Sequence, residues 1–185
     1  MKVVLIGIQG SGKSTQGNLL SKALKIPYLS TGHIFRELAK EHTPHGRYIK
    51  EIMNSGLLIP DEKTITIVNE YLARAEYKKG YILDGFPRTA HQAETFEEKP
   101  DHVIYLKVSD KEALWRLAFR EGEGAEARED ETVIAIRKRI DLFHEKTKPV
   151  LAYYRKHDTL VEVDGEQSIE DIHKEIMRHL KHELA

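Results

Sequence analysis

Short apolar runs alternate along this chain with longer segments in which apolar residues recur every three or four positions. The runs are rich in β-branched and aromatic residues and end at turn-forming residues, which is typical of strands rather than helices. We therefore predict strands at residues 2–7, 27–31, 81–86, 102–108 and 159–165.

The segments between the predicted strands carry helical signals. Two apolar series at helical spacing are Val133, Ile136, Ile140 and Phe143, and Ile169, Ile172, Ile176, Leu180 and Leu184. Residues 109–112 (Ser-Asp-Lys-Glu) and 168–171 (Ser-Ile-Glu-Asp) have the spacing of capping boxes that open helices. Pro149 interrupts a helical pattern, which predicts a kink or a new helix start.

Strands that alternate with helices predict an α/β fold, in which right-handed crossovers build a parallel sheet covered by helices on both faces. Two segments depart from this alternation. Residues 32–80 are too many for one crossover helix, so we predict a small helical insertion there. Residues 121–127 (EGEGAEA) are polar and lack periodicity, which predicts a flexible loop.

Composition narrows the class of protein. A chain of 185 residues suits one domain, and a formal net charge of −1 argues against general binding to nucleic acid or to a membrane surface. Met1 leads directly into the first predicted strand, and no apolar stretch approaches the ~20 residues that span a bilayer. We expect a cytoplasmic protein without nucleic-acid or membrane partners.

A glycine-rich motif follows the first predicted strand. Residues 7–14 (GIQGSGKS) match the P-loop pattern G-x-x-x-x-G-K-[ST] and precede a helical pattern. Its glycines let backbone N–H groups converge on an anion, the helix adds its positive dipole end, and Lys13 supplies a charge for the outer phosphates. An ordinary glycine turn is the bland alternative, and the position between strand and helix favours phosphate binding. The motif alone fits a kinase, a GTPase, a motor or a nucleotide sensor.

Further motifs carry a resemblance to a known family. The segments GSGKSTQ (10–16), STGHIFR (30–36), LDGFPRTAHQAE (83–94), RLAFR (116–120) and 128–139 stand in the order found in adenylate kinases. Over nearly its whole length the chain resembles the short-lid form of these nucleoside monophosphate kinases. The resemblance implies a P-loop fold with a parallel five-stranded sheet in a single domain. The expected divisions are a core at 1–29, 60–119 and 129–185, a small helical monophosphate-binding insertion at 30–59, and a short lid at 120–128.

The same resemblance implies reversible, Mg²⁺-dependent phosphoryl transfer, in which MgATP and AMP give two ADP, and a role in adenine nucleotide homeostasis. Such chemistry needs positioning and charge neutralisation, for which arginine is well suited. The expected catalytic residues are Lys13, Arg88, Arg120, Arg128 and Arg139. The expected ATP contacts are Gly10, Ser11, Gly12, Lys13, Ser14, Thr15, Arg116 and Gln167. The expected AMP contacts are Thr31, Arg36, Leu57, Leu58, Ile59, Gly85, Arg88, Gln92, Arg128 and Arg139.

Alternatives stay open at several of these positions. Thr31 and Gln92 match positions that read adenine, yet Thr89-x-x-Gln92 is also a capping box. Leu58 fits a place around the acceptor base and simple core packing equally well. For the whole chain, the alternatives are a UMP or CMP kinase and, from another class, a non-catalytic nucleotide-binding regulatory module.

The expected metal site departs from the family pattern. Glycine usually follows the P-loop lysine in adenylate kinases, and T-G-D usually stands where this chain has Thr31-Gly32-His33. Asp84, at the end of the third strand, is expected to orient waters around Mg²⁺. We hypothesise that Ser14 ligates Mg²⁺ directly and so compensates for the aspartate missing at position 33. The alternative is that Ser14 caps the first helical turn and His33 points to solvent.

The lid region also bears on cofactors and partners. Long-lid relatives insert a small domain, often with zinc, between positions like Arg120 and Arg128, whereas here only residues 121–127 intervene and the chain has no cysteine. We therefore expect no zinc. The expected small-molecule partners are ATP, AMP and ADP, and the expected state is a monomer.

Overall fold

A single parallel sheet organises the chain in the computed structural model, which describes residues 1–119 and 132–182. The strand order is β2-β3-β1-β4-β5, and every neighbouring pair is parallel. The strands are β1 (Lys2–Ile6), β2 (Tyr28–Ser30), β3 (Tyr81–Asp84), β4 (His102–Lys107) and β5 (Leu160–Asp164). The predicted α/β fold with a five-stranded parallel sheet is confirmed, and each strand is shorter than predicted by one or more residues.

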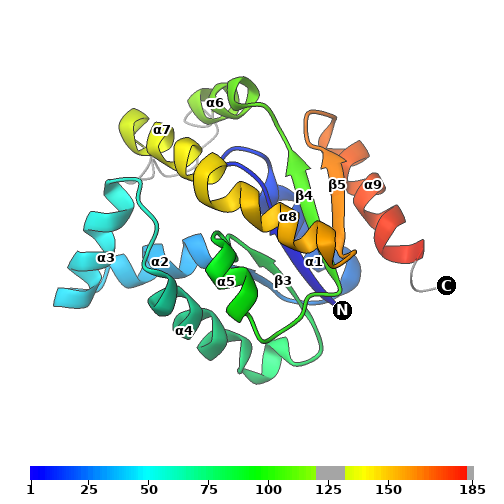
Figure 1. The fold of residues 1–185 in the computed structure, drawn as a ribbon. Helices are drawn as coiled ribbons and strands as arrows, with labels where there is room; N and C mark the ends of the chain where they lie inside the picture. Colours follow the sequence, from blue (N-terminus) through cyan, green and yellow to red (C-terminus); the bar gives the residue numbers. More distant parts are fainter. Residues whose placement is uncertain (120–131, 183–185) are drawn as a thin grey trace.

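Helices connect successive strands, as Figure 1 shows. The α-helices of the described residues are α1 (Lys13–Leu24), α2 (Thr31–Ala39), α3 (Pro44–Asn54), α4 (Asp61–Leu72), α5 (Ala90–Thr95), α6 (Asp110–Phe119), α7 (Val133–Leu142), α8 (Lys148–Lys156) and α9 (Ile169–His182). The described residues also form two short helices of other types, the 3₁₀ helix η1 (Ala75–Tyr77) and the π-helical turn η3 (Phe143–Thr147). No helix of the described residues has the length and apolarity needed to cross a membrane.

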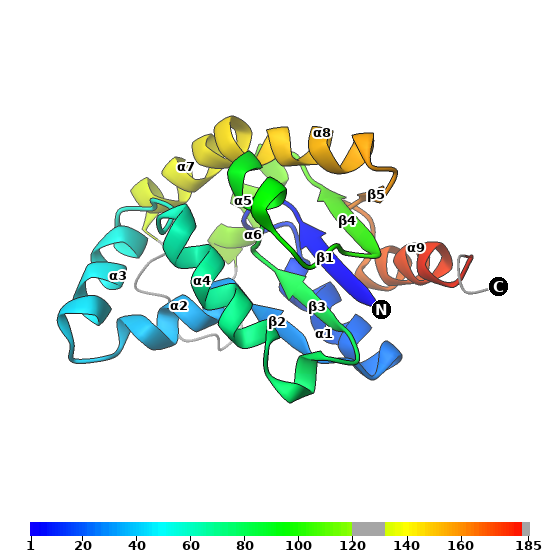
Figure 2. The same cartoon turned by 60° about the horizontal axis from the view of Figure 1, so that its bottom comes forward.

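Both faces of the sheet are buried. In β1, Val3 and Leu5 belong to one hydrophobic cluster with α1 and α9, whereas Val4 and Ile6 belong to another with α4, α5, α7 and α8. Figure 2 shows α1 and α9 on one side of the sheet and α4, α5 and α8 on the other. A fully buried side chain of this size contributes roughly 1.5–3 kcal/mol. The two-sided core therefore explains why the strands read as continuous apolar runs.

The strand order switches at β1. The chain adds β2 and β3 on one side of β1, and then β4 and β5 on the other side. Ligands of open α/β sheets bind beyond the carboxyl ends of the strands at such a switch point. The P-loop leaves the carboxyl end of β1, and Asp84 is the last residue of β3. The fold thus brings the two motifs together.

The long connection between β2 and β3 is helical, as predicted, and contains α2, α3 and α4. A small core of its own holds α2 and α3 together, made of Phe35, Ile49, Met53 and Ile59. The role of residues 30–59 as a monophosphate-binding insertion stays a prediction. The loop and lid predicted at 120–128 lie outside the described residues.

The predicted capping boxes form only in part. The Ser109 hydroxyl accepts from the backbone N–H of Glu112 at 3.3 Å, but the Ser109 N–H donates to the carboxylate of Glu166 at 2.8 Å, so the reciprocal bond expected from Glu112 is replaced. At α9, Ser168 accepts from the backbone N–H of Asp171 and donates its hydroxyl to the Asp171 carboxylate. Both helices begin where the sequence predicted, and at α6 a tertiary contact with Glu166 has altered the cap.

Pro149 marks a helix restart, as predicted. The chain passes from α7 through the π-helical turn Phe143–Thr147 into α8, where Pro149 occupies the second position. Proline is tolerated in a first helical turn because its missing N–H would have no partner within the helix there. The interruption thus reflects where proline can sit in a helix.

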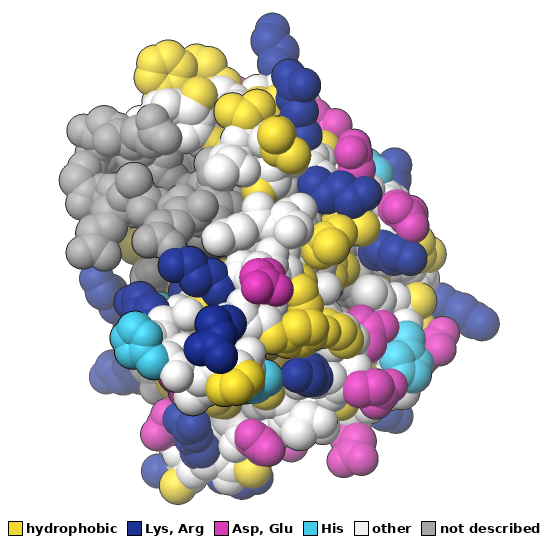
Figure 3. All heavy atoms as spheres, turned by 90° about the vertical axis from the view of Figure 1, so that its left-hand side faces the viewer, with side chains coloured by type: hydrophobic (Ala, Val, Ile, Leu, Met, Phe, Trp, Pro, Cys, Tyr) yellow, Lys and Arg dark blue, Asp and Glu magenta, His cyan; other side chains and the backbone are white. Residues whose placement is uncertain are grey.

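Charged side chains are mixed on the face that contains the α2–α3 connection. Figure 3 shows that Lys, Arg, Asp and Glu side chains are interspersed there rather than segregated by sign. This agrees with the near-neutral charge of the chain, and the described residues form no extended basic surface on that face.

Candidate active site

A cavity of about 670 Å³ opens at the carboxyl ends of β1 and β3. Its volume is typical of a small-molecule site. The predicted site residues that line it are Gly10, Ser11, Gly12, Lys13, Ser14, Thr15, Arg36, Leu57, Leu58, Ile59, Asp84, Gly85, Arg88, Gln92, Arg116, Arg139 and Gln167. Thr31 does not line it, and Arg120 and Arg128 lie outside the described residues.

The P-loop has the backbone geometry that the motif predicts. Gly10 and Gly12 adopt left-handed conformations, with φ of 88° and 89°. A Cβ on Gly10 would also lie only 2.7 Å from the carbonyl oxygen of Ala113, so a side chain is excluded by contact as well as by strain. Gly12 is the N-cap of α1, and no side chain of the described residues caps that helix. The helix N-terminus therefore presents its N–H groups to the cavity.

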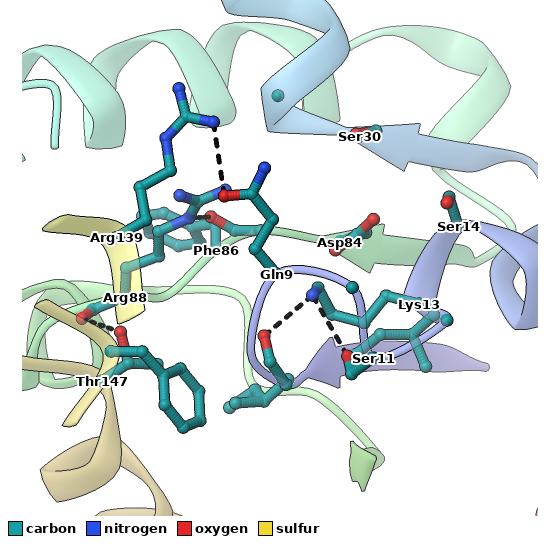
Figure 4. Close-up of a pocket in the computed structure, with 18 of the residues that line it drawn as sticks. Gln9, Ser11, Lys13, Ser14, Ser30, Asp84, Phe86, Arg88, Arg139 and Thr147 are labelled. Atoms are coloured by element: carbon teal, nitrogen blue, oxygen red, sulfur yellow. Dashed lines mark hydrogen bonds between the residues drawn. The ribbon is translucent and has the colours of Figure 1, made fainter. Parts of the chain in front are cut away.

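Lys13 lies back across the P-loop. Its ammonium donates to the carbonyl oxygens of Gly7 at 2.8 Å and Ile8 at 2.9 Å, and to the Ser11 hydroxyl at 3.4 Å. Figure 4 shows the ammonium held over the loop, on the cavity side. A strongly anionic phosphate competes well with neutral carbonyl oxygens for such a cation, because charge-assisted hydrogen bonds are the stronger ones.

Arg88 stands between the loop after β3 and the helix α5. Its Nε donates to the Gly85 carbonyl at 2.7 Å, and its backbone carbonyl accepts from the Thr147 hydroxyl at 2.9 Å. These contacts fix the base of the side chain while its guanidinium lines the cavity. The geometry suits bidentate binding of a phosphate.

Arg139, from α7, reaches across to the P-loop. Its guanidinium donates to the Gln9 side-chain oxygen at 3.4 Å and to the Met53 carbonyl at 2.9 Å. In Figure 4 Arg88 and Arg139 lie on the same side of the cavity, with Lys13, Ser14 and Asp84 opposite them. Cations from distant parts of the sequence therefore converge on one space.

Asp84 is a buried carboxylate beside the P-loop, with 7% of its surface exposed. Its Oδ2 accepts from the Tyr28 hydroxyl at 2.7 Å, and its backbone carbonyl accepts from the Thr31 hydroxyl at 3.2 Å. Burial, and then the Asp84 charge, raises the pKa of Tyr28, so the phenol keeps its proton and donates it. The Thr31 hydroxyl is thus turned to the backbone of residue 84 rather than to the cavity.

The residues present fit a magnesium ion. Ser14 and Asp84 both line the cavity beside Lys13, and hydroxyl and carboxylate oxygens are ligands that Mg²⁺ accepts directly or through water. Ser14 does not cap α1, which argues against the alternative that this serine serves only to cap the first helical turn. His33 is exposed, as that alternative supposed, and lines a second, small cavity rather than the large one.

Gln92 makes the capping contact considered for it, and its side chain is held by two further hydrogen bonds. The Thr89 hydroxyl accepts from its backbone N–H at 3.2 Å, which caps α5, while its side-chain oxygen accepts from the Arg88 N–H at 2.8 Å. Its amide nitrogen donates to Asp61 at 2.8 Å. The side chain is 1% exposed yet lines the cavity, and its role in reading a base stays a prediction.

The three apolar residues Leu57, Leu58 and Ile59 of the insertion differ in burial. Ile59 is 6% exposed and packs in the small core of α2 and α3. Leu57 is 45% exposed, Leu58 is half-buried, and both line the cavity. Core packing therefore accounts for Ile59, whereas Leu57 and Leu58 leave apolar surface for a ligand.

Helix α6 closes another side of the cavity. Arg116 donates from Nε to the Glu112 carboxylate at 2.7 Å, and the neighbouring Trp115 is 57% exposed. The Trp115 ring lies 4.8 Å from that of Phe119, centroid to centroid. A planar guanidinium beside an exposed indole is suited to stacking on a base.

Sequence reasoning missed three residues that hold this site. The Gln9 side-chain oxygen accepts from Arg139, and the Tyr28 hydroxyl donates to Asp84. The Asp61 carboxylate accepts from both the Gln92 amide and the Thr89 hydroxyl. Only Gln9 carried a signal, because it occupies a variable position inside the P-loop. The other two reach the site from outside any motif.

The sequence is similar to those of known proteins. Residues 5–159 match the family described as Adenylate kinase. The chain belongs to the adenylate kinase family. It is 38% identical to the adenylate kinase of Cyanothece sp. over 190 aligned positions, which cover 99% of this chain and 96% of that protein. It is 35% identical to those of Caldicellulosiruptor bescii and Clostridium novyi, with 97% and 98% of this chain covered and 99% of each relative.

Family membership makes this chain a nucleoside monophosphate kinase, a phosphotransferase that binds nucleotides. The alignment with the Caldicellulosiruptor bescii protein spans 212 positions, more than the 185 residues of this chain, so that relative contains residues that are absent here. The short lid at residues 120–128 stays a prediction.

Proposed function

We propose that the chain catalyses reversible transfer of a phosphoryl group from MgATP to AMP, which yields two molecules of ADP. The observation that carries the proposal most directly is that one cavity joins the P-loop to Arg36, Arg88 and Arg139. A nucleotide sensor needs a phosphate cradle but has no use for further arginines at the far side of it. An in-line transfer between two nucleotides needs both.

The P-loop and α6 form the donor side of this site. Backbone N–H groups of the loop and Lys13 hold the outer phosphates of ATP, Arg116 lies against its adenine, and Gln167 adds a polar contact at the mouth of the cavity. Bound Mg²⁺ would supply charge neutralisation between the phosphates, held by Ser14 and, through water, by Asp84. Lys13 leaves the carbonyls of the loop when phosphate arrives.

The acceptor side lies between α2 and the loop after β3. Arg36 and Arg88 hold the phosphate of AMP so that its oxygen faces the terminal phosphorus of ATP, with Gln92 at the base edge. The new bond joins that oxygen to the phosphorus as the bond to ADP breaks, and Arg139, with Arg120 and Arg128, neutralises the charge in transit. The lid then excludes water, because hydrolysis would otherwise compete.

Identity of the acceptor is testable with a panel of monophosphates. We expect ADP formation from MgATP and AMP, with UMP and CMP at least ~10-fold slower, because the Gln92 amide is fixed by Asp61 and cannot turn over at no cost to suit another base. The assay measures each diphosphate separately. Equal rates with UMP or CMP would replace AMP by a pyrimidine acceptor, and no transfer to any of the three would favour a regulatory module.

Trp115 reports the donor side. Because it lines the cavity next to Arg116, a bisubstrate analogue is expected to change its fluorescence clearly, with AMP alone doing much less. It is the chain's only tryptophan, so the signal has one source. The measurement is emission intensity during titration. Equal changes with AMP and with ATP would contradict the division into donor and acceptor sides.

Ser14 and His33 form a test of the metal hypothesis. If Ser14 compensates for the aspartate missing at position 33, Ser14→Gly raises the Mg²⁺ concentration needed for activity about tenfold. Adding His33→Asp then lowers that concentration again by much of the difference. The structure gives the first half its reason, since the Ser14 hydroxyl is not used as a cap. The requirement is read from activity against free Mg²⁺ in the four variants of the cycle. Additive, independent effects would mean that the two positions do not compensate.

The remaining expectations follow from this reaction. We propose that the enzyme acts in the cytoplasm, where ATP, AMP and ADP interconvert, and that it works as a monomer without a lid zinc. Size-exclusion chromatography with light scattering checks the monomer, and a mass of twice 21.3 kDa would contradict it.

A further inference from the structure

Tyr28 connects the edge of the sheet to the candidate metal side of the cavity. In the register between β2 and β3, Tyr28 stands opposite Ile82, and Ser30 stands opposite Asp84. The Tyr28 side chain therefore extends along the strand by two residues to place its hydroxyl 2.7 Å from Oδ2 of Asp84. Only a long side chain with a terminal donor can make this contact from that position.

Gly17 in α1 gives the ring its place. A Cβ built on Gly17 would lie 2.4 Å from Cε2 and 2.7 Å from Cδ2 of Tyr28, which is closer than carbon atoms can approach. Glycine is otherwise unfavourable inside a helix. Its presence five residues into α1 is explained by the ring that lies against it, so two distant positions in the sequence cooperate in one contact.

Asp84, which accepts the hydrogen bond from Tyr28, is one of few described acidic residues at the cavity. Of the described residues that line the large cavity, only Asp84 and Glu112 are acidic, and Glu112 is engaged by Arg116. Position 33, which lines the small cavity rather than the large one, carries a histidine and supplies no carboxylate. Outer-shell support for a metal on the phosphate side therefore depends on the orientation of one carboxylate.

We infer that Tyr28 is a positioning residue for metal binding, which fixes the Asp84 carboxylate so that its second oxygen accepts from the water shell of Mg²⁺, and that Gly17 makes the room this requires. The inference rests on the proposed function, because it assumes a magnesium–nucleotide complex in the cavity. Partners that orient a metal-supporting ligand in this way commonly change affinity for the metal when they are removed.

The test is Tyr28→Phe, which deletes a single oxygen atom and keeps the ring against Gly17. The probe is Mn²⁺, whose paramagnetic resonance reports binding without any turnover, added to the protein with AMP and the β,γ-imido analogue of ATP. The protein is kept in excess so that little free nucleotide competes for the ion. We expect the dissociation constant of Mn²⁺ to rise about tenfold, the low end of the ~10–100-fold range for outer-shell partners.

Tyr81→Phe is the matched control. Tyr81 opens β3, the strand that ends at Asp84; it is 1% exposed, and its buried hydroxyl has no hydrogen-bond partner among the described residues. Its replacement should leave Mn²⁺ affinity unchanged, because Tyr81 lies at the end of β3 away from Asp84. Unchanged affinity in Tyr28→Phe, or an equal loss in Tyr81→Phe, would overturn the inference.

Gly17→Ala supplies a second, independent route to the same contact. As a single substitution, it should displace the Tyr28 ring and weaken Mn²⁺ binding. Added to Tyr28→Phe, it should weaken binding no further, because the hydroxyl is already gone. An equal further loss in that background would mean that the ring, not the hydroxyl, matters. ADP formation by the unchanged protein tests the proposed function separately, so the failure of one is distinguishable from the failure of the other.

Discussion

Replacing Arg88 with Ala is expected to lower the rate of ADP formation by about 10³–10⁵-fold, the effect of removing a catalytic arginine from phosphoryl transfer. The guanidinium lines the cavity opposite Lys13 and is held in place by the carbonyl of Gly85, so its loss removes both charge and alignment. The free energy of unfolding should fall by only about 1 kcal/mol, the value of that one hydrogen bond. Steady-state kinetics and urea denaturation measure the two effects.

Arg155→Ala is the control for this substitution. Arg155 is exposed, pairs with Glu162 and does not line the cavity. An exposed ion pair contributes little, at most about 1 kcal/mol, and the activity should stay unchanged. Activity within tenfold of normal in Arg88→Ala would show that the acceptor phosphate binds elsewhere.

Replacing Leu83 with Ala is expected to do the opposite, with a large loss of stability and little loss of activity in the molecules that remain folded. Leu83 is fully buried in the second-last position of β3, in the cluster that joins the sheet to α4, α5 and α8. Truncating a buried leucine lowers the free energy of unfolding by about 2–5 kcal/mol. This is a large share of the roughly 5–15 kcal/mol that holds a typical domain together.

Leu114→Ala is the same chemical change at an exposed site, where the side chain is 40% exposed. Its expected effect on the free energy of unfolding is about 0.5 kcal/mol or less. Urea denaturation at a temperature where both variants are folded compares them. Equal losses in the two variants would contradict the placement of Leu83 in the core.

The sheet and its site loop were predictable because they rest on local signals. The apolar run at residues 2–7 and the P-loop after it predicted a buried strand and an anion cradle, and both are present. Pro149 predicted the helix restart for a similar reason, since proline limits its own backbone whatever surrounds it. Such signals act within a few residues of their source.

The contacts that the sequence did not predict join distant segments. Tyr28 reaches Asp84 because β2 and β3 are neighbours, although 56 residues separate the two side chains. Glu166 takes the N–H of Ser109 across 57 residues and so displaces the expected half of a capping box. These are choices among hydrogen-bond partners that only the assembled fold brings within reach.

Binding of a bisubstrate analogue, two adenosines joined through five phosphates, tests most directly whether one cavity holds both nucleotides for transfer. Isothermal titration calorimetry should show one analogue bound per chain, and saturating ATP and saturating AMP should each weaken its binding. Two analogues per chain, or competition by ATP but not by AMP, would contradict the account, because donor and acceptor would then not share the cavity between Lys13 and Arg88.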